Sequence, residues 1–503
     1  VGRRAAAEGD PAVKAALRKA GCVAAAAQAF QRFGPYAANE KAWQNVTKDL
    51  LAEGQRELAE MEGTDLLQLL QVLAVDARVT SGVFWEGLTE RIEPCLEKLT
   101  LQELTEVAEL YTRIQAWQRP VFAAALRKAS REAAVHWMEP ADLVRLLDIF
   151  CRAGRGSLDL SPMAAQLFNE ADDRIREDVA DFDVDNCITL VTSMARFRAV
   201  KESILRLVGR EVLHPPLCEG SLHGPKALEI CRAYGELGYR HDTVFKHVLG
   251  EVLVEHVKLQ RARSLGSELP SVQYTTSDVA LLCFSLLRLK MHRGNTTWYK
   301  WGDQYRDLLD ALTRRLEAPK ELDNVGAEPL AAASFALGRA RRGSVELYKA
   351  MYARMMQLLE AASDAAEPPQ DYLERFMHGL AMMGPDRKKD LDAEWLMQWL
   401  CGNVYTIMVS DFILVNRHLV LMGCYDREYL QMLVPFFCDA ERMAQLRKSD
   451  IMELTNTYNG ARIREDDIPD GMGKHFFWAM GRQYQKVHVD SQGGRRRTFR
   501  RVG

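Results

Sequence analysis

The sequence predicts an all-α protein, an α-solenoid of about ten stacked antiparallel helix pairs. Apolar residues recur with the period of an amphipathic helix, and this helical pattern itself recurs roughly every 38–40 residues. Runs of β-branched residues are few, which argues against an all-β protein. Of the 503 residues 48% are apolar and 27% are charged, so the chain can bury a large core.

The helix pair is clearest in the second repeat. Leu104, Val107 and Tyr111 form one stripe of its first helix, and its second helix repeats this spacing over 121–129. The first helix of the sixth repeat, 279–289, is apolar around much of its circumference and therefore needs cover on more than one side. Neighbouring helix pairs provide that cover in a solenoid. A non-repetitive all-α protein is the alternative.

The repeats organise residues 64–485. Their first helices are expected to begin near Leu66, Leu104, Leu143, Ile188, Ala227, Val279, Leu330, Leu373, Ile413 and Ile451. Insertions lengthen the fifth to seventh repeats, and proline-containing links separate several of them. Residues 1–63 are predicted to be an Ala-rich helical cap, and residues 486–503 a basic, flexible tail.

Cysteine usage and the first residues bear on the compartment. None of the ten cysteines forms a C-x-x-C pair, and most lie in apolar runs, so we expect thiols in a reducing compartment. The opening VGRRAAAEGD is compatible with the remainder of an Arg- and Ala-rich mitochondrial presequence, and an arbitrary start is the alternative. No apolar run reaches about 18 residues, so no membrane span is predicted.

A basic residue lies at the turn between the two helices of every repeat. These turn cations are Arg78; Arg113 and Arg119; Arg152 and Arg155; Arg196, Arg198 and Lys201; Arg240; Arg288, Lys290 and Arg293; Arg339, Arg341 and Arg342; Arg387, Lys388 and Lys389; Arg427; Arg462 and Arg464. Equivalent turns of a solenoid share one edge, so a basic stripe that binds phosphates is predicted despite a net charge of −3. Capping of helix C-termini by cations is the competing interpretation.

The predicted RNA-binding residues are drawn from these turns and from the tail, which would act as an electrostatic arm. They are Arg152, Arg155, Arg196, Arg198, Arg240, Arg293, Arg339, Arg341, Arg342, Arg387, Lys388, Lys389, Arg462, Arg464, Arg495, Arg496 and Arg497. Trp298, Tyr299 and Trp301 offer aromatic faces to bases, but packing is the expected role. Replacing the 339–342 arginines by Ala is expected to weaken RNA binding uniformly and to reduce its salt dependence.

Catalytic motifs are absent from the sequence. It contains no P-loop, dinucleotide-binding, zinc-protease or nucleophile-elbow motif. The dispersed histidines, including His241 and His247, are expected to be structural, and the acidic loop 465–470 is a weak metal candidate. We therefore predict a protein that is not an enzyme and has no cofactor, metal site or small-molecule substrate.

An Asp-rich run resembles the start of a calcium loop. Asp181, Asp183 and Asp185 have the right spacing, but Asn186 occupies the position of the required Gly and Thr192 that of the bidentate Glu. The run is therefore predicted to be a link that caps the following helix.

The repeat plan resembles a known family. In 226–249, KALEICRAYGELGYRHDTVFKHVL, an apolar helix ends in an LGYRH turn and a second helix follows; 143–168 and 330–359 share this plan. It resembles the roughly 37-residue heptatricopeptide-type repeats of organellar RNA-metabolism proteins, also found upstream of RAP domains and in the FASTK family. The likeness covers about 64–485. No C-terminal RAP domain follows, so nothing supports a nuclease-like activity.

The resemblance implies a mitochondrial-matrix protein of a ribonucleoprotein assembly. Similar proteins of kinetoplastids and alveolates serve in RNA-editing complexes or divergent mitoribosomes. It implies a non-catalytic scaffold whose partners are protein subunits and RNA, whether guide RNA, mRNA or rRNA. The alternative, favoured by the near-neutral charge, is a purely structural subunit of a mitoribosome or of a respiratory or ATP synthase complex. A cytosolic adaptor of the HEAT or armadillo type is a third, weaker possibility.

Overall fold

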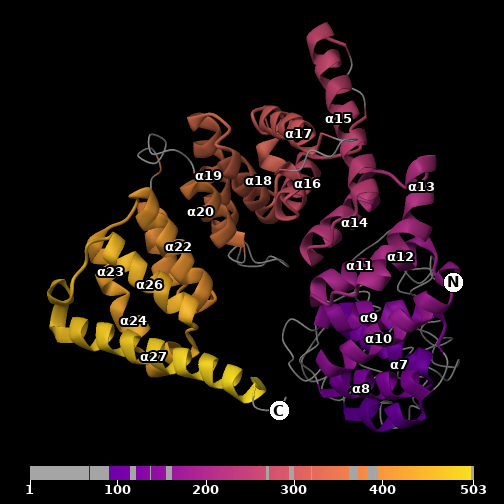
Figure 1. The fold of residues 1–503 in the computed structure, drawn as a ribbon, viewed down its shortest axis with the longest axis horizontal. Helices are drawn as coiled ribbons and strands as arrows, with labels where there is room; N and C mark the ends of the chain where they lie inside the picture. Colours follow the sequence, from indigo (N-terminus) through magenta and orange to yellow (C-terminus); the bar gives the residue numbers. More distant parts are fainter. Residues whose placement is uncertain are drawn as a thin grey trace, which may run out of the picture. The chain divides into compact units, whose positions relative to one another are not determined.

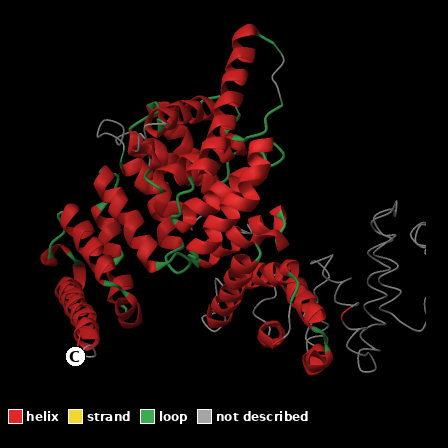
Figure 2. Cartoon of the chain, turned by 45° about the vertical axis from the view of Figure 1, so that its right-hand side comes forward, coloured by secondary structure: helices red, strands yellow, loops and turns green. Residues whose placement is uncertain are grey.

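The computed structural model describes Leu67 and residues 90–113, 120–135, 138–153, 161–267, 271–293, 300–318, 320–361, 372–382, 391 and 393–499. The elements in these ranges are helices, as Figure 1 and Figure 2 show, so the all-α prediction is confirmed. No helix within them is long and apolar enough to cross a membrane. The expected cap, 1–63, lies outside the described residues.

The chain divides into two compact units, residues 1–222 and 223–503. The first unit contains α7 (Leu101–Arg113), α8 (Pro120–Val135), α9 (Pro140–Ala153), α10 (Ser161–Glu177), α11 (Val184–Phe197), α12 (Glu202–Leu207) and α13 (His214–Glu219), with a π-helical turn, Val208–Leu213, before α13. Helix α9 packs against α7, α10 and α11. The expected first helices of the second, third and fourth repeats, α7, α9 and α11, are therefore neighbours.

The second unit contains α14–α27. Its helices are α14 (Gly224–Leu237), α15 (Asp242–Leu265), α16 (Thr276–Arg288), α17 (Trp301–Leu316), α18 (Ala327–Ala340), α19 (Val345–Glu360), α20 (Leu373–Ala381), α21 (Glu394–Gly402), α22 (Val409–Met422), α23 (Arg427–Met432), α24 (Val434–Cys438), α25 (Ala440–Gln445), α26 (Lys448–Gly460) and α27 (Met472–Phe499). The expected first helices α14, α16, α18, α20, α22 and α26 each pack against the next (Figure 1). Helix α27 continues into the segment expected to be the tail.

Helices α18 and α20 approach each other unusually closely, through glycines. The Ser334 hydroxyl donates to the carbonyl of Phe376 at 2.9 Å. One turn further on, Gly338 lies against the backbone of Gly379, and a Cβ on Gly379 would collide with the backbone of Ser334. The contacts follow the same order along both helices, so α18 and α20 run in parallel.

The Asp-rich run is a helix-capping link, as predicted. Asp183 precedes α11, and its side chain accepts a hydrogen bond from the backbone N–H of Asn186 at 2.7 Å. This satisfies one of the N–H groups that a helix N-terminus leaves without an intrahelical partner.

A buried ion pair joins α15 to α17. Glu255 and Arg315 are both more than nine-tenths buried, and Arg315 Nη2 donates to Glu255 Oε1 at 2.9 Å. The other carboxylate oxygen accepts from the backbone N–H of Gln273 at 2.7 Å, and Arg315 also donates to the carbonyl of Tyr274. The pair therefore fixes the link that precedes α16.

His256, one residue along α15 from this ion pair, makes stability depend on pH. Burial, and then the charges of Arg315, Arg314 and Arg263, lower its pKa from 6.5 to about 4. Between these two pH values His256 binds a proton in the unfolded chain but not in the folded chain. The contribution of His256 to the free energy of unfolding is therefore fully present above pH 6.5 and is lost as the pH falls toward 4. Because the imidazole is partly exposed, we expect His256 to account for about 1 kcal/mol of that fall.

The measurement is urea unfolding at pH 7 and pH 4.5, for the wild type and for H256Q. The loss between the two pH values should be smaller in H256Q. An identical loss in both proteins would mean that His256 titrates alike in the folded and unfolded chains.

Candidate nucleic-acid interface

Two of the predicted cations in the first unit share a carboxylate. Arg152 Nη2 lies 2.6 Å from Asp148 Oδ2, and Arg196 Nη1 lies 2.8 Å from Asp148 Oδ1. Asp148 itself is buried. Asp148 therefore neutralises part of the charge of both guanidinium groups. This pairing weakens the predicted basic stripe in the first unit.

Three turn arginines of the second unit are also paired. Arg240 forms a salt bridge with Asp242, two residues later in the chain, and Arg342 forms one with Asp310. Arg427 Nη2 lies 3.0 Å from Asp467 Oδ2. Capping and local ion pairing thus account for part of the sequence pattern.

Four further turn cations share a left-handed backbone conformation. They are Arg198 with φ 56°, Lys290 with φ 58°, Arg341 with φ 54° and Arg462 with φ 54°. They follow the C-terminal ends of α11, α16, α18 and α26, which are expected first helices. Equivalent positions after α14 and α22 hold Gly238 and Gly423, also left-handed. Four turns thus carry a cation where the backbone favours glycine.

The left-handed residue is part of the hydrogen-bond pattern that ends these helices. After α18 the N–H of Arg341 donates to Gly338 and that of Arg342 to Leu337, and the same pair of bonds closes α11 and α26. This arrangement satisfies helix-end carbonyls but needs one left-handed residue. All five non-glycine residues with positive φ in the described ranges are Arg or Lys, the fifth being Lys320 between α17 and α18.

The side chains of these four turn cations are exposed. Within the described ranges none of them forms an ion pair or a side-chain hydrogen bond. They therefore differ from the paired arginines described above. We name Arg198, Lys290, Arg341 and Arg462 the left-handed cations.

The other predicted residues lie in several settings. Arg339 is exposed and its Nη1 lies 3.7 Å from Met382 Sδ, while Arg464 begins the short turn that Asp467 caps. Arg155, Arg387, Lys388 and Lys389 lie outside the described residues. Arg293 ends the 3-10 helix Met291–Arg293, and Arg495, Arg496 and Arg497 continue the backbone of α27; their side chains are outside the description.

The aromatic cluster has one described member. Trp301, at the start of α17, is 2% exposed, so its predicted packing role is confirmed. The Arg240 guanidinium lies 5.9 Å from the centre of its ring. Trp298 and Tyr299 lie outside the described residues.

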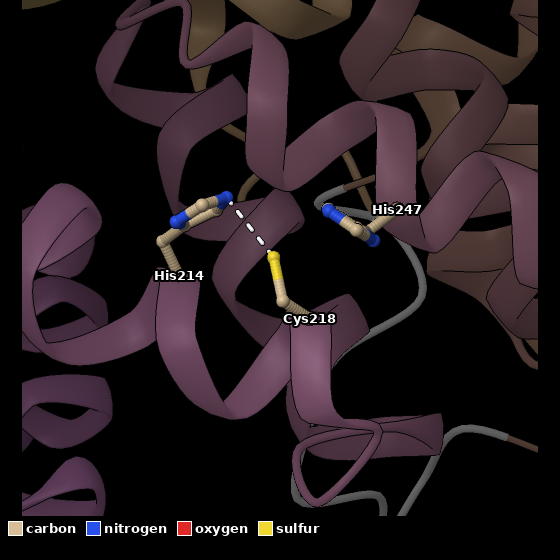
Figure 3. Close-up of side chains that lie close together, drawn as sticks. All are labelled: His214, Cys218 and His247. Carbon is tan, nitrogen blue, oxygen red and sulfur yellow. Dashed lines mark hydrogen bonds between the residues drawn. The ribbon is translucent and has the colours of Figure 1, made fainter.

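A thiol–imidazole contact was not predicted from the sequence. Cys218 Sγ lies 3.1 Å from His214 Nε2, one turn apart on α13 (Figure 3). The i, i+4 spacing of Cys and His is the signal that indicates such a pair.

Comparison with known proteins adds no family. No protein-family model matches the chain, and no curated protein is significantly similar to it. The arrangement of the turn cations is therefore the observation from which a function is argued.

Proposed function

We propose that this chain is an α-solenoid of about ten helix-pair repeats that binds RNA phosphates through cations at its intra-repeat turns. In this proposal it is a non-catalytic scaffold of a mitochondrial ribonucleoprotein complex, in RNA editing, RNA processing or translation. The observation that carries the proposal is the set of left-handed cations. The resemblance to organellar helical repeats supports the choice of RNA.

The argument from conformation is energetic. A left-handed residue with a Cβ costs about 1 kcal/mol relative to glycine. A cation placed one or two residues earlier would complement the helix dipole without this cost. Capping therefore does not explain why Arg198, Lys290, Arg341 and Arg462 occupy the one strained position of the turn. A backbone outlier of this kind is a reason to look for function.

The geometry narrows the set of RNA-binding residues. In the 339–342 cluster Arg342 is neutralised by Asp310, whereas Arg339 and Arg341 are exposed and have no ion pair among the described residues. The helices α18 and α20 run in parallel, as do α22 and α26, where Arg417 donates to the carbonyl of Asn456 and Val420 contacts Gly460. Turns after parallel helices share an edge, which supports a common binding edge in the second unit.

The test uses the triple substitution K290G/R341G/R462G in the full chain. Affinity for a single-stranded RNA should fall by at least about tenfold, because each lost phosphate contact removes counterion release. The free energy of unfolding should stay the same or rise by up to about 1 kcal/mol for each substituted position, because glycine relieves the backbone strain. Binding by fluorescence anisotropy and unfolding in urea measure the two effects separately.

The matched control is K320G. Lys320 is exposed and has φ 65°, but it does not follow a first helix. Its substitution should affect stability in the same way and leave RNA affinity unchanged. If the triple variant bound RNA as tightly as the wild type, the left-handed cations would not be part of the RNA-binding surface.

A purely structural subunit is the second candidate, favoured by the paired arginines. Arg152, Arg196, Arg240, Arg342 and Arg427 are each in contact with a carboxylate. Crosslinking in the native organelle, with identification of co-purified proteins, separates the two. RNA crosslinks at the turns support the RNA scaffold, whereas co-purification with a large complex and no RNA crosslinks supports an architectural subunit.

A further inference from the structure

A cluster of two histidines and one glutamate spans α20 and α22 in the second unit. Glu374 Oε1 lies 3.6 Å from His378 Nδ1 and 3.3 Å from His418 Nε2. Potential ligand atoms of the three residues all lie within 4.8 Å of one another. Two imidazole nitrogens and a carboxylate oxygen are a common ligand set for divalent transition metals.

We propose that Glu374, His378 and His418 bind one divalent transition-metal ion, with Zn²⁺ as the best match, and that the ion links α20 to α22. This inference is independent of RNA binding and concerns residues that the turn edge does not use. The proposed site has three protein ligands and an exchangeable fourth position. It lies between α20 and α22, the expected first helices of two successive repeats.

The separations fit a four-coordinate ion. With metal–ligand distances of about 2.0–2.1 Å, neighbouring ligand atoms of a tetrahedral site lie about 3.3–3.4 Å apart. Of the two separations from Glu374 Oε1, the one to His418 Nε2, 3.3 Å, is at the lower end of this range and the one to His378 Nδ1, 3.6 Å, is slightly above it. They are also longer than good hydrogen bonds. Glu374 therefore lies at close to a ligand–ligand distance from both imidazoles, and the ligand atoms of the two histidines lie within 4.8 Å of each other.

The helices hold the ligands in place. Glu374 and His378 are four residues apart on α20, so they lie on the same face. The ring of His378 stacks on that of His418 at 4.7 Å between centroids, and Phe335 of α18 packs edge-on against His378 at 5.0 Å. This packing restricts the movement of both rings.

The charge of Glu374 is also suited to a cation. A carboxylate supplies a negative charge, and one oxygen of Glu374 faces both imidazoles. The nearby arginines are engaged elsewhere, Arg375 over the ring of Phe284 and Arg417 with Glu453.

The two histidines differ in exposure. His418 is 6% exposed as a residue and presents its Nε2 to Glu374. His378, in contrast, is about 39% exposed, which gives an ion and its fourth ligand, a water, access from solvent.

The experiment is titration of the chelator-treated full chain with Zn²⁺ and with Co²⁺. We expect uptake of one equivalent, a rise in Tm with Zn²⁺, and the intense visible absorption of four-coordinate Co²⁺. H378Q and E374Q should each weaken the affinity by about 100-fold or more, since loss of an outer partner alone costs 10–100-fold. H475Q, at an exposed histidine of α27, is the control and should bind like the wild type.

Two results would overturn the proposal. One is the absence of saturable one-equivalent binding in the folded wild type, checked by circular dichroism. The other is equal binding by the wild type, H378Q and E374Q. H378Q is included because a half-exposed side chain can be replaced without loss of the fold, so a failure to bind is not confused with unfolding.

Discussion

The substitution G379A is expected to lower the free energy of unfolding by about 3 kcal/mol. The added methyl group would collide with the backbone of Ser334 and Phe335 on α18, where no side chain can move aside. Relief requires α18 and α20 to separate, and overpacking of this kind typically costs about 1–3 kcal/mol or more. Urea unfolding followed by circular dichroism measures the loss.

The control for this substitution is G250A. Gly250 lies within α15, and a Cβ there meets no atom within 4 Å. Alanine should therefore stabilise that helix by about 0.5–1 kcal/mol. If G379A proves as stable as G250A, the close contact between α18 and α20 is not present in solution.

Breaking the buried pair of Glu255 and Arg315 is expected to be equally severe. E255A leaves Arg315, which is 5% exposed as a residue, without its carboxylate partner. The backbone N–H of Gln273 also loses its acceptor. Removal of one partner from a buried ion pair costs about 3–5 kcal/mol. Thermal and urea unfolding should both show the loss.

Two companion variants separate the ion pair from general damage. R306A removes an exposed partner of Asp303 on α17 and should cost less than about 0.5 kcal/mol. The double variant E255L/R315M replaces both charges by apolar groups and should be more stable than E255A. Equal losses in E255A and R306A would show that the pair is solvated.

The helical fold was predictable because its signal is distributed along the chain. Apolar residues at helical spacing, such as Leu104, Val107 and Tyr111, are 0% exposed in the structure. A period near 40 residues places α14, α16, α18, α20, α22 and α26 in register, and these helices do pack in succession. This periodicity does not depend on any single residue, so it can be recognised in one sequence without homologous sequences.

The candidate site was predictable only in part. The positions of the basic turns follow from the repeat, but the pairing of Arg152 and Arg196 with one buried carboxylate depends on helix packing. The left-handed conformation of Arg341 had a signal, since glycine stands at the aligned position in the LGYRH turn. Comparing aligned turns residue by residue would have separated this arginine from its paired neighbour Arg342.

The metal cluster also had a sequence signal. Glu374 and His378 have an i, i+4 spacing, and His418 lies 40 residues after His378, which is one repeat. Equivalent positions of adjacent first helices are neighbours in a stack. A search within one repeat cannot find such a site, because its ligands come from two.

The salt dependence of RNA binding tests the central claim most directly. For the wild type and a single-stranded oligouridylate, the logarithm of the affinity should fall linearly with the logarithm of salt concentration, by about 0.7 for each phosphate neutralised. The K290G/R341G/R462G variant should have a slope smaller by about 2, because three contacts are lost. An unchanged slope, or a wild type that does not bind RNA, would contradict the account.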